Sequence, residues 1–237
     1  MNADKDIIRA PKPMIEVEGI KKYFEISKGI IKRKKQYIKA VDDISLKINK
    51  GEIVGLVGES GSGKTTLARV MLRLAKMSGG NVNIDGINLR NATKADMKRL
   101  HQEVAVVFQD PAANLNPRQT VESSIMRPMI IHGIPKREAK QKAKDVLNMV
   151  KLDQRYLDSY PHQLSGGQLQ RLGLARSLYH KKDVFIIDEG TANLDSKLAD
   201  DIEEIILNDK ESTVIMITHR NSEKIENLAD KVITLGS

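Results

Sequence analysis

The sequence has no cysteine and no tryptophan, and only 3% of its 237 residues are aromatic. The absence of cysteine excludes disulfide bonds and any metal or redox centre built on thiolates, and it fits a reducing compartment. The scarcity of aromatic rings argues against a platform on which the bases of single-stranded nucleic acid would stack.

Long apolar stretches are missing as well. No run approaches the roughly 18 apolar residues that a membrane-spanning helix needs. The N-terminal segment MNADKDIIRAPKP has no long apolar core and no small-residue cleavage site, so it does not resemble a secretory signal. We therefore expect a cytoplasmic protein whose membrane contact, if it has one, is made through another protein or the lipid surface.

The remaining composition is that of an ordinary globular protein, with 40% hydrophobic and 30% charged residues. The length is enough for one α/β domain with a sizeable core and a smaller lobe. A net charge of +8 is compatible with a solvated lysine-rich surface, and equally with attraction to nucleotide, anionic lipid or nucleic acid. Charge alone does not decide between these alternatives.

Apolar runs that suit strands alternate with helical periodicities along the chain. Strands are predicted at 14–17, 44–48, 53–57, 104–108, 184–187 and 213–218, with a loop or hairpin over 25–39. Helices are predicted after residue 65 with Leu67, Val70, Met71 and Leu74 on one face, within a helical lobe over 120–160, from 166 to about 180, and over 195–207. This alternation predicts a mostly parallel sheet.

A phosphate-binding loop follows the strand at 53–57. The residues Gly58, Glu59, Ser60, Gly61, Ser62, Gly63, Lys64 and Thr65 fit the pattern G-x-x-x-x-G-K-[ST], and Thr66 follows them. Glycines allow successive N–H groups to point into one concavity at the positive end of a helix dipole. Lys64 adds a full charge for the terminal phosphates, and the Thr65 hydroxyl is a ligand suited to Mg²⁺. This loop identifies a nucleoside triphosphatase without saying which kind.

Polar residues stand at the ends of three other predicted strands. Asp188 and Glu189 follow the strand at 184–187, Gln109 follows that at 104–108, and His219 follows that at 213–218. Ligands of such sheets bind beyond the carboxyl ends of the strands. One acid can hold the shell of Mg²⁺ while the next orients and deprotonates the attacking water.

A second anion-binding helix start is predicted at Ser165-Gly166-Gly167-Gln168. Ser165 is a natural N-cap, and the glycines leave backbone N–H groups accessible at the start of the helix. An ordinary capped helix remains an equally good reading of these residues alone.

Taken together, these segments resemble the ABC ATPase family, in family order and over nearly the whole chain. Residues 58–65 resemble Walker A, 107–110 (VFQD) the Q-loop, 164–168 (LSGGQ) the signature, 184–189 (VFIIDE) Walker B, 193–195 (NLD) the D-loop and 217–219 (ITH) the H-loop. The resemblance implies one P-loop NTPase domain with a RecA-like core. An antiparallel β subdomain and the Walker A part would cover 14–109, a helical subdomain 110–165, and the remaining core 166–237.

The resemblance also implies a head-to-tail dimer with two ATP molecules between the subunits. Glu189 would be the general base, His219 a sensor of the γ-phosphate, and Gln109 a contact to metal and water that links to the helical subdomain. Thr65, Gln109 and Asp188 would hold Mg²⁺. Asp195 and the 165–168 segment would complete the nucleotide site. Phe24, with Tyr23 as the alternative, would stack on adenine.

A finer resemblance points to ATPase subunits of oligopeptide, dipeptide and nickel importers, on AVDDISL at 40–46 and QDPAANLNPRQTV at 109–121. The implied partners are integral membrane permeases, a second ATP-binding subunit and, indirectly, an extracytoplasmic binding protein, at the inner face of the cell membrane. Gly190, Arg220 and the end at Ser237 depart from that subfamily. An exporter motor and a soluble ABC ATPase acting on nucleic acid or ribosomes therefore stay open, whereas an N-K-x-D guanine-reading motif is absent.

Overall fold

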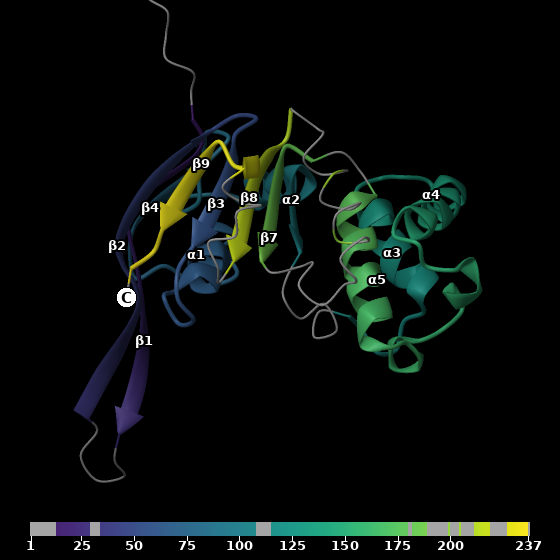
Figure 1. Cartoon of the computed structure of the whole chain (residues 1–237), viewed down its shortest axis with the longest axis horizontal. Helices are drawn as coiled ribbons and strands as arrows, with labels where there is room; N and C mark the ends of the chain where they lie inside the picture. The colour runs from purple at the N-terminus through teal and green to yellow at the C-terminus, as the bar shows by residue number, and fades with distance from the viewer. Residues whose placement is uncertain are drawn as a thin grey trace, which may run out of the picture.

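The computed structural model describes residues 13–28, 34–107, 115–179, 182–188, 211–218 and 227–236, together with residues 199 and 204. In this part of the chain two sheets and a lobe of helices lie side by side (Figure 1). The arrangement confirms the predicted fold class, a P-loop α/β core with an antiparallel β subdomain and a helical subdomain. The subdomain boundaries at 110 and 165 stay a prediction.

The first sheet is antiparallel, in the order β2-β1-β4-β5. Its strands are β1 (Pro13–Lys28), β2 (Lys34–Asn49), β4 (Gly79–Ile84) and β5 (Ile87–Asn88). The predicted strand at 14–17 is therefore much longer, and the segment at 25–39 is a hairpin rather than an open loop. Lys28 pairs with Lys34 at the end of the register, so β1 and β2 form one long ribbon.

The second sheet is parallel, in the order β6-β7-β8-β3-β9. Its strands are β3 (Ile53–Val57), β6 (Val104–Val107), β7 (Val184–Asp188), β8 (Thr213–Thr218) and β9 (Lys231–Thr234). The predictions for β3 and β8 match to the residue. Because all the strands run the same way, their carboxyl ends meet at one edge of the sheet, which we call the catalytic edge.

The helices flank this sheet. They are α1 (Lys64–Met71), α2 (Lys94–Glu103), α3 (Val121–Ile131), α4 (Lys136–Met149) and α5 (Gly166–Leu178), with short 3₁₀ turns at Gln154–Tyr156 and Pro161–Gln163. The predicted helical lobe over 120–160 is confirmed. The prediction that Leu74 shares one helical face with Leu67, Val70 and Met71 is wrong, because α1 ends at Met71 and Leu74 is 60% exposed.

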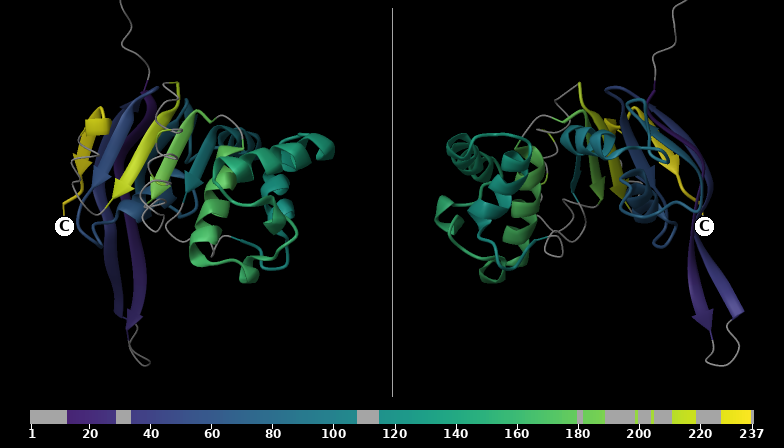
Figure 2. Two further views of the ribbon diagram at one scale, coloured as in Figure 1. Left: turned by 45° about the vertical axis from the view of Figure 1, so that its right-hand side comes forward. Right: turned by 180° about the vertical axis from the view of Figure 1, so that it is seen from behind.

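Alternate residues of the parallel sheet enter two different cores. Ile186 and Ile215 pack with α1 and the antiparallel sheet, whereas Phe185, Ile187 and Met216 pack with the helical lobe. The parallel sheet therefore lies between the two cores and contributes side chains to both (Figure 2). This burial on both faces explains why its central strands are continuous apolar runs.

Candidate nucleotide site

The phosphate-binding loop lies between β3 and α1, as its sequence predicts. Gly58–Gly63 form the loop, and Lys64–Thr66 begin the helix. The Leu67 N–H donates to the Gly63 carbonyl over 2.8 Å, which closes the first helical bond. The loop therefore sits at the positive end of the α1 dipole, where backbone N–H groups favour an anion.

The Lys64 side chain is folded into this loop and is only 3% exposed. Its Nζ donates to the carbonyls of Gly58 and Glu59 over 2.7 Å each, and lies 3.2 Å from the Ser62 hydroxyl. These carbonyl and hydroxyl oxygens hold the ammonium in place within the loop. The loop is therefore preorganised for a group with several negative oxygens.

Two glycines of the loop are required by close packing. A Cβ on Gly63, which has a φ of 92°, would lie 2.1 Å from the Ala40 carbonyl oxygen of β2. A Cβ on Gly58 would lie 2.5 Å from the Leu235 carbonyl oxygen. The loop is thus clamped between the antiparallel sheet and the segment after β9, a contact that the sequence does not reveal.

Thr65 and Asp188 meet at the catalytic edge. The Thr65 hydroxyl lies 3.1 Å from Asp188 Oδ1, across 123 residues of sequence, and the Asp188 side chain is 2% exposed. β7 and β3 both pair with β8, with Asp188 opposite Ile217 and Val57 opposite Thr218, so their ends are level. A hydroxyl and a carboxylate beside a phosphate-binding loop are a donor set that fits Mg²⁺.

The second predicted helix start also has the expected cap. The Ser165 hydroxyl accepts from the Gln168 N–H over 3.4 Å, and Gln168 Oε1 accepts from the Ser165 N–H over 2.8 Å. Cβ atoms on Gly166 or Gly167 would meet nothing within 4 Å, so the space in front of α5 is open. Gln168 Nε2 lies 2.9 Å from the Tyr156 hydroxyl, a partner that sequence analysis missed because nothing in the sequence marks Tyr156.

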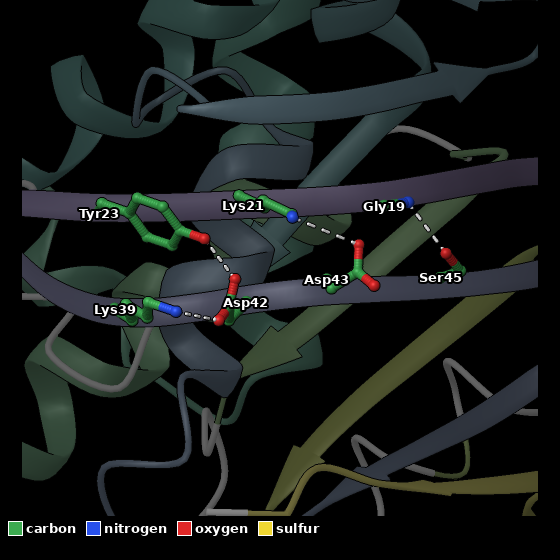
Figure 3. A network of polar contacts seen from close by, with 7 residues as sticks. All are labelled: Gly19, Lys21, Tyr23, Lys39, Asp42, Asp43 and Ser45. Carbon is green, nitrogen blue, oxygen red and sulfur yellow. Dashed lines mark hydrogen bonds and ion pairs between the residues drawn. The ribbon is translucent and has the colours of Figure 1, made fainter.

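Tyr23 and Phe24 lie on β1, next to the strand that packs on the loop. The Tyr23 hydroxyl donates to Asp42, and Lys39 Nζ lies 2.8 Å from the same carboxylate (Figure 3). Lys39 and Tyr23 hold the pKa of Asp42 below its ordinary value, and the bond to Asp42 raises the pKa of Tyr23. The Phe24 ring is 44% exposed, with the Lys22 ammonium 4.5 Å from its centroid.

Gln109, Glu189, Asp195 and His219 lie outside the described residues, so their roles stay predictions. The described strands that precede Gln109, Glu189 and His219 in the sequence are β6, β7 and β8. β6 ends at Val107, β7 at Asp188 and β8 at Thr218. These ends belong to neighbouring parallel strands.

A buried strand, a glycine loop around a buried lysine, and a hydroxyl–carboxylate pair at the same edge define a P-loop nucleoside triphosphatase. The family model described as "ABC transporter" matches residues 41–192, well over half of the chain. The chain belongs to the ABC transporter family, as an ATP-binding ATPase.

Relatives and solved structures agree with this assignment. The chain is 36% identical over 224 residues to the oligopeptide transport ATP-binding protein AppF of Bacillus subtilis, covering 92% of this chain and 68% of AppF. It is 39% identical over 225 residues to the methionine import ATP-binding protein MetN of Staphylococcus saprophyticus, covering 94% of this chain but only 63% of MetN. The dimeric ATP-binding cassette MJ0796, in a post-hydrolysis state bound to ADP and Pi, superimposes with a TM-score of 0.82 at 27% identity, over 94% of each chain. Within the described part of the chain, no helix is long and apolar enough to cross a bilayer.

Proposed function

We propose that this chain binds ATP with Mg²⁺ and hydrolyses it between two subunits to drive import of a peptide or a related small solute. The contact between Thr65 and Asp188 carries the first part of this proposal, because it unites the phosphate loop with the Walker B strand at one point. Mg²⁺ bound there by Thr65 and Asp188, with Gln109 nearby, would neutralise charge on the phosphate oxygens.

The protein groups have separate tasks in this reaction. Residues 58–66, with Lys64, hold the phosphates, and Phe24 stacks on the adenine. Glu189, which follows the buried Asp188, takes a proton from the attacking water. The oxygen of that water bonds to the γ-phosphorus, and ADP leaves. His219 contacts the γ-phosphate from the end of β8.

The open start of α5 completes the site from a second subunit. Ser165–Gln168 point their helix start into open space, and Asp195 would lie at the same junction. The starts of α1 and α5 can both bind a triphosphate if two chains pair head to tail. Each triphosphate then lies between the phosphate loop of one chain and the signature segment of its neighbour.

Import is supported by the relatives, which are named as oligopeptide transport, peptide import and methionine import proteins. The permeases that these names imply would bind this chain at the inner face of the membrane, and an extracytoplasmic binding protein would deliver the solute. Closure of the ATP-bound dimer would move the permease, and product release would reopen it.

The direct test replaces Thr65 by valine and, as the matched control, by serine. Valine has nearly the shape of threonine but no hydroxyl, so Mg²⁺-dependent turnover should fall by about 100-fold or more. Serine restores the oxygen and should keep turnover within about threefold of the parent. Equal turnover in the valine variant would remove Thr65 from the metal site and with it the proposed chemistry.

Transport is tested separately, in cells whose only copy of the chain is the parent or a variant. Lys64→Ala should abolish uptake of a labelled peptide while leaving the level of the chain unchanged. Uptake that persists in this variant would assign the ATPase to another kind of cargo.

A further inference from the structure

The ends of β1 and β2 form a ribbon that stands clear of the body, and we call residues 22–28 and 34–39 the arm. Figure 1 and both views of Figure 2 show the arm extending past the ends of β7 and β8, in the direction in which those strands run. With seven residues at about 3.3 Å each, the β1 half of the arm is about 23 Å long. The arm belongs to the antiparallel sheet and therefore projects on the same side of the molecule as the catalytic edge, and beyond it.

The arm is held firmly at its base. The Gly19 N–H donates to the Ser45 hydroxyl over 2.9 Å, and the Lys21 ammonium lies 3.7 Å from Asp43 (Figure 3). Beyond them Asp42 accepts from both Tyr23 and Lys39. Three successive contacts between β1 and β2 fix the direction of the arm relative to the loop that Ala40 touches.

Large apolar side chains are exposed on the arm. Phe24, Tyr37 and Ile38 are 44%, 57% and 54% exposed. Phe24 pairs with Ile38 across the ribbon, so both lie on one face. Tyr37, next to Ile38 in β2, lies on the opposite face. Exposed apolar side chains on both faces of a projecting element indicate a contact surface.

Its charge is strongly one-sided. The arm carries five lysines and a single acid, Glu25; the lysines are Lys22, Lys28, Lys34, Lys35 and Lys39. An acidic partner surface would complement this excess of lysine in the sequence of the arm.

We infer that the arm binds a second copy of this chain, across the nucleotide interface, on the turn that precedes the partner's signature segment. This inference rests on the proposed function, because the sandwich places each Ser165 over the neighbour's phosphate loop. The surroundings of Ser165 then face the catalytic edge from which the arm projects.

The turn over residues 153–163 has the matching chemistry. Asp153, Asp158 and Tyr160 are exposed on it, with Arg155 3.8 Å from Asp153, and the Tyr160 ring stacks on His162 with 5.8 Å between centroids. The turn is held in place, since Gln163 Oε1 accepts from the Tyr160 N–H over 2.7 Å. Carboxylates would face the lysines of the arm, and the stacked rings would face Tyr37 and Ile38, which leaves Phe24 for the adenine as proposed above.

An anionic membrane is the other surface that lysines and exposed rings could suit. The direction of the arm favours the subunit, because the arm extends on the same side of the molecule as the nucleotide site, which the proposed sandwich covers with protein. The experiments below treat membrane binding as a contrary outcome.

The first experiment measures the ATP-dependent dimer of the full chain in the Glu189→Gln background by analytical ultracentrifugation. Tyr37→Thr with Ile38→Thr should raise the dimer dissociation constant at least about tenfold, with ATP affinity of the monomer unchanged. The matched control is Ile130→Gln with Ile131→Gln, two residues of α3 that are 45% and 59% exposed, and it should leave the dimer unchanged.

The outcomes are distinguishable. An unchanged dimer in the arm variant, or lost binding to phosphatidylglycerol vesicles with dimerisation intact, would overturn the arm contact and leave the proposed function standing. A chain that forms no ATP-dependent dimer even without the arm substitutions would overturn the sandwich, and the inference with it.

The second experiment uses the absence of native cysteine. Tyr37→Cys combined with Tyr160→Cys should give a crosslinked dimer with a short bismaleimide, and only when ATP is present. The control pair, Tyr37→Cys with Ile131→Cys, should stay monomeric under the same conditions. Equal crosslinking of the two pairs, or crosslinking independent of ATP, would contradict the contact.

Discussion

At Gly63 the backbone takes a φ of 92°, and the Ala40 carbonyl oxygen would lie 2.1 Å from an added Cβ. Gly63→Ala should therefore lower the free energy of unfolding by about 2–4 kcal/mol, from backbone strain plus overlap. Gly133 is the matched control, with a φ of 91° and nothing within 4 Å. Gly133→Ala should cost only about 1 kcal/mol. Urea unfolding measures both, and equal losses would show that Ala40 yields.

A buried cation offers a second residue-level test. Lys182 is 4% exposed; its Nζ donates to the Gln102 carbonyl over 2.7 Å and lies 5.0 Å from the Tyr179 ring centroid. Burial lowers the pKa of Lys182 below its ordinary value of 10.5. The folded state therefore binds this proton less tightly than the unfolded state, so stability rises with pH from the lowered pKa up to 10.5.

Lys182→Met should remove this pH dependence. Relative to the parent, the variant should gain most at neutral pH and lose that gain as the pH approaches 10, where the unfolded lysine also discharges. Urea unfolding of both proteins from pH 7 to 10 measures the difference. A difference that does not change with pH would show that Lys182 titrates normally in the folded chain.

At the scale of the element, two helices with the same cap separate stability from function. α5 begins with Ser165 and Gln168 bonded reciprocally, and α2 begins with Thr93 and Asp96 bonded in the same way. Ser165→Ala and Thr93→Ala should each destabilise the chain by about 1 kcal/mol. Only Ser165→Ala should also reduce ATP turnover, at least about tenfold, because in the proposed sandwich its hydroxyl would face the neighbour's triphosphate. Turnover that falls equally in both variants would reduce Ser165 to a structural cap.

The sequence predicted some helices and strands to the residue and missed others, and the burial of each element explains the difference. β3 and β8 are covered on both faces, so their continuous apolar runs could be bounded to the residue. β9 is largely exposed, and α2 buries only Leu100, so neither has a strong periodic signal. β4 begins with Gly79 and Gly80 and was missed for the same reason, since glycines weaken a strand pattern.

The site follows the same rule. The meeting of Thr65 with Asp188 was predictable, because parallel strands bring their carboxyl ends together. The packing of Ala40 on Gly63 was not predictable, nor was the bond between Gln168 and Tyr156. Each depends on how separate elements dock, which local sequence patterns do not encode.

On the scale of the whole molecule, one sheet joins two cores. The phosphate loop belongs to the core with the antiparallel sheet, and α5 belongs to the core of the helical lobe. The two helix starts that we propose to bind the triphosphate are thus carried by different bodies of one chain. A rotation of one body against the other would change how the start of α5 meets the triphosphate on the neighbouring subunit. Such a rotation would transmit the nucleotide state to a permease.

The sandwich predicts that two inactive chains restore each other. Lys64→Ala damages the phosphate loop but keeps the signature segment, whereas Gly166→Arg fills the open space before α5 but keeps the loop. Each variant alone should be inactive, since every site then contains one damaged half. With random pairing in a 1:1 mixture, half of the dimers combine both variants, and each holds one intact site, so turnover should recover to about a quarter of the parent. A mixture that stays inactive while both variants fold would mean that each nucleotide site is built within a single chain.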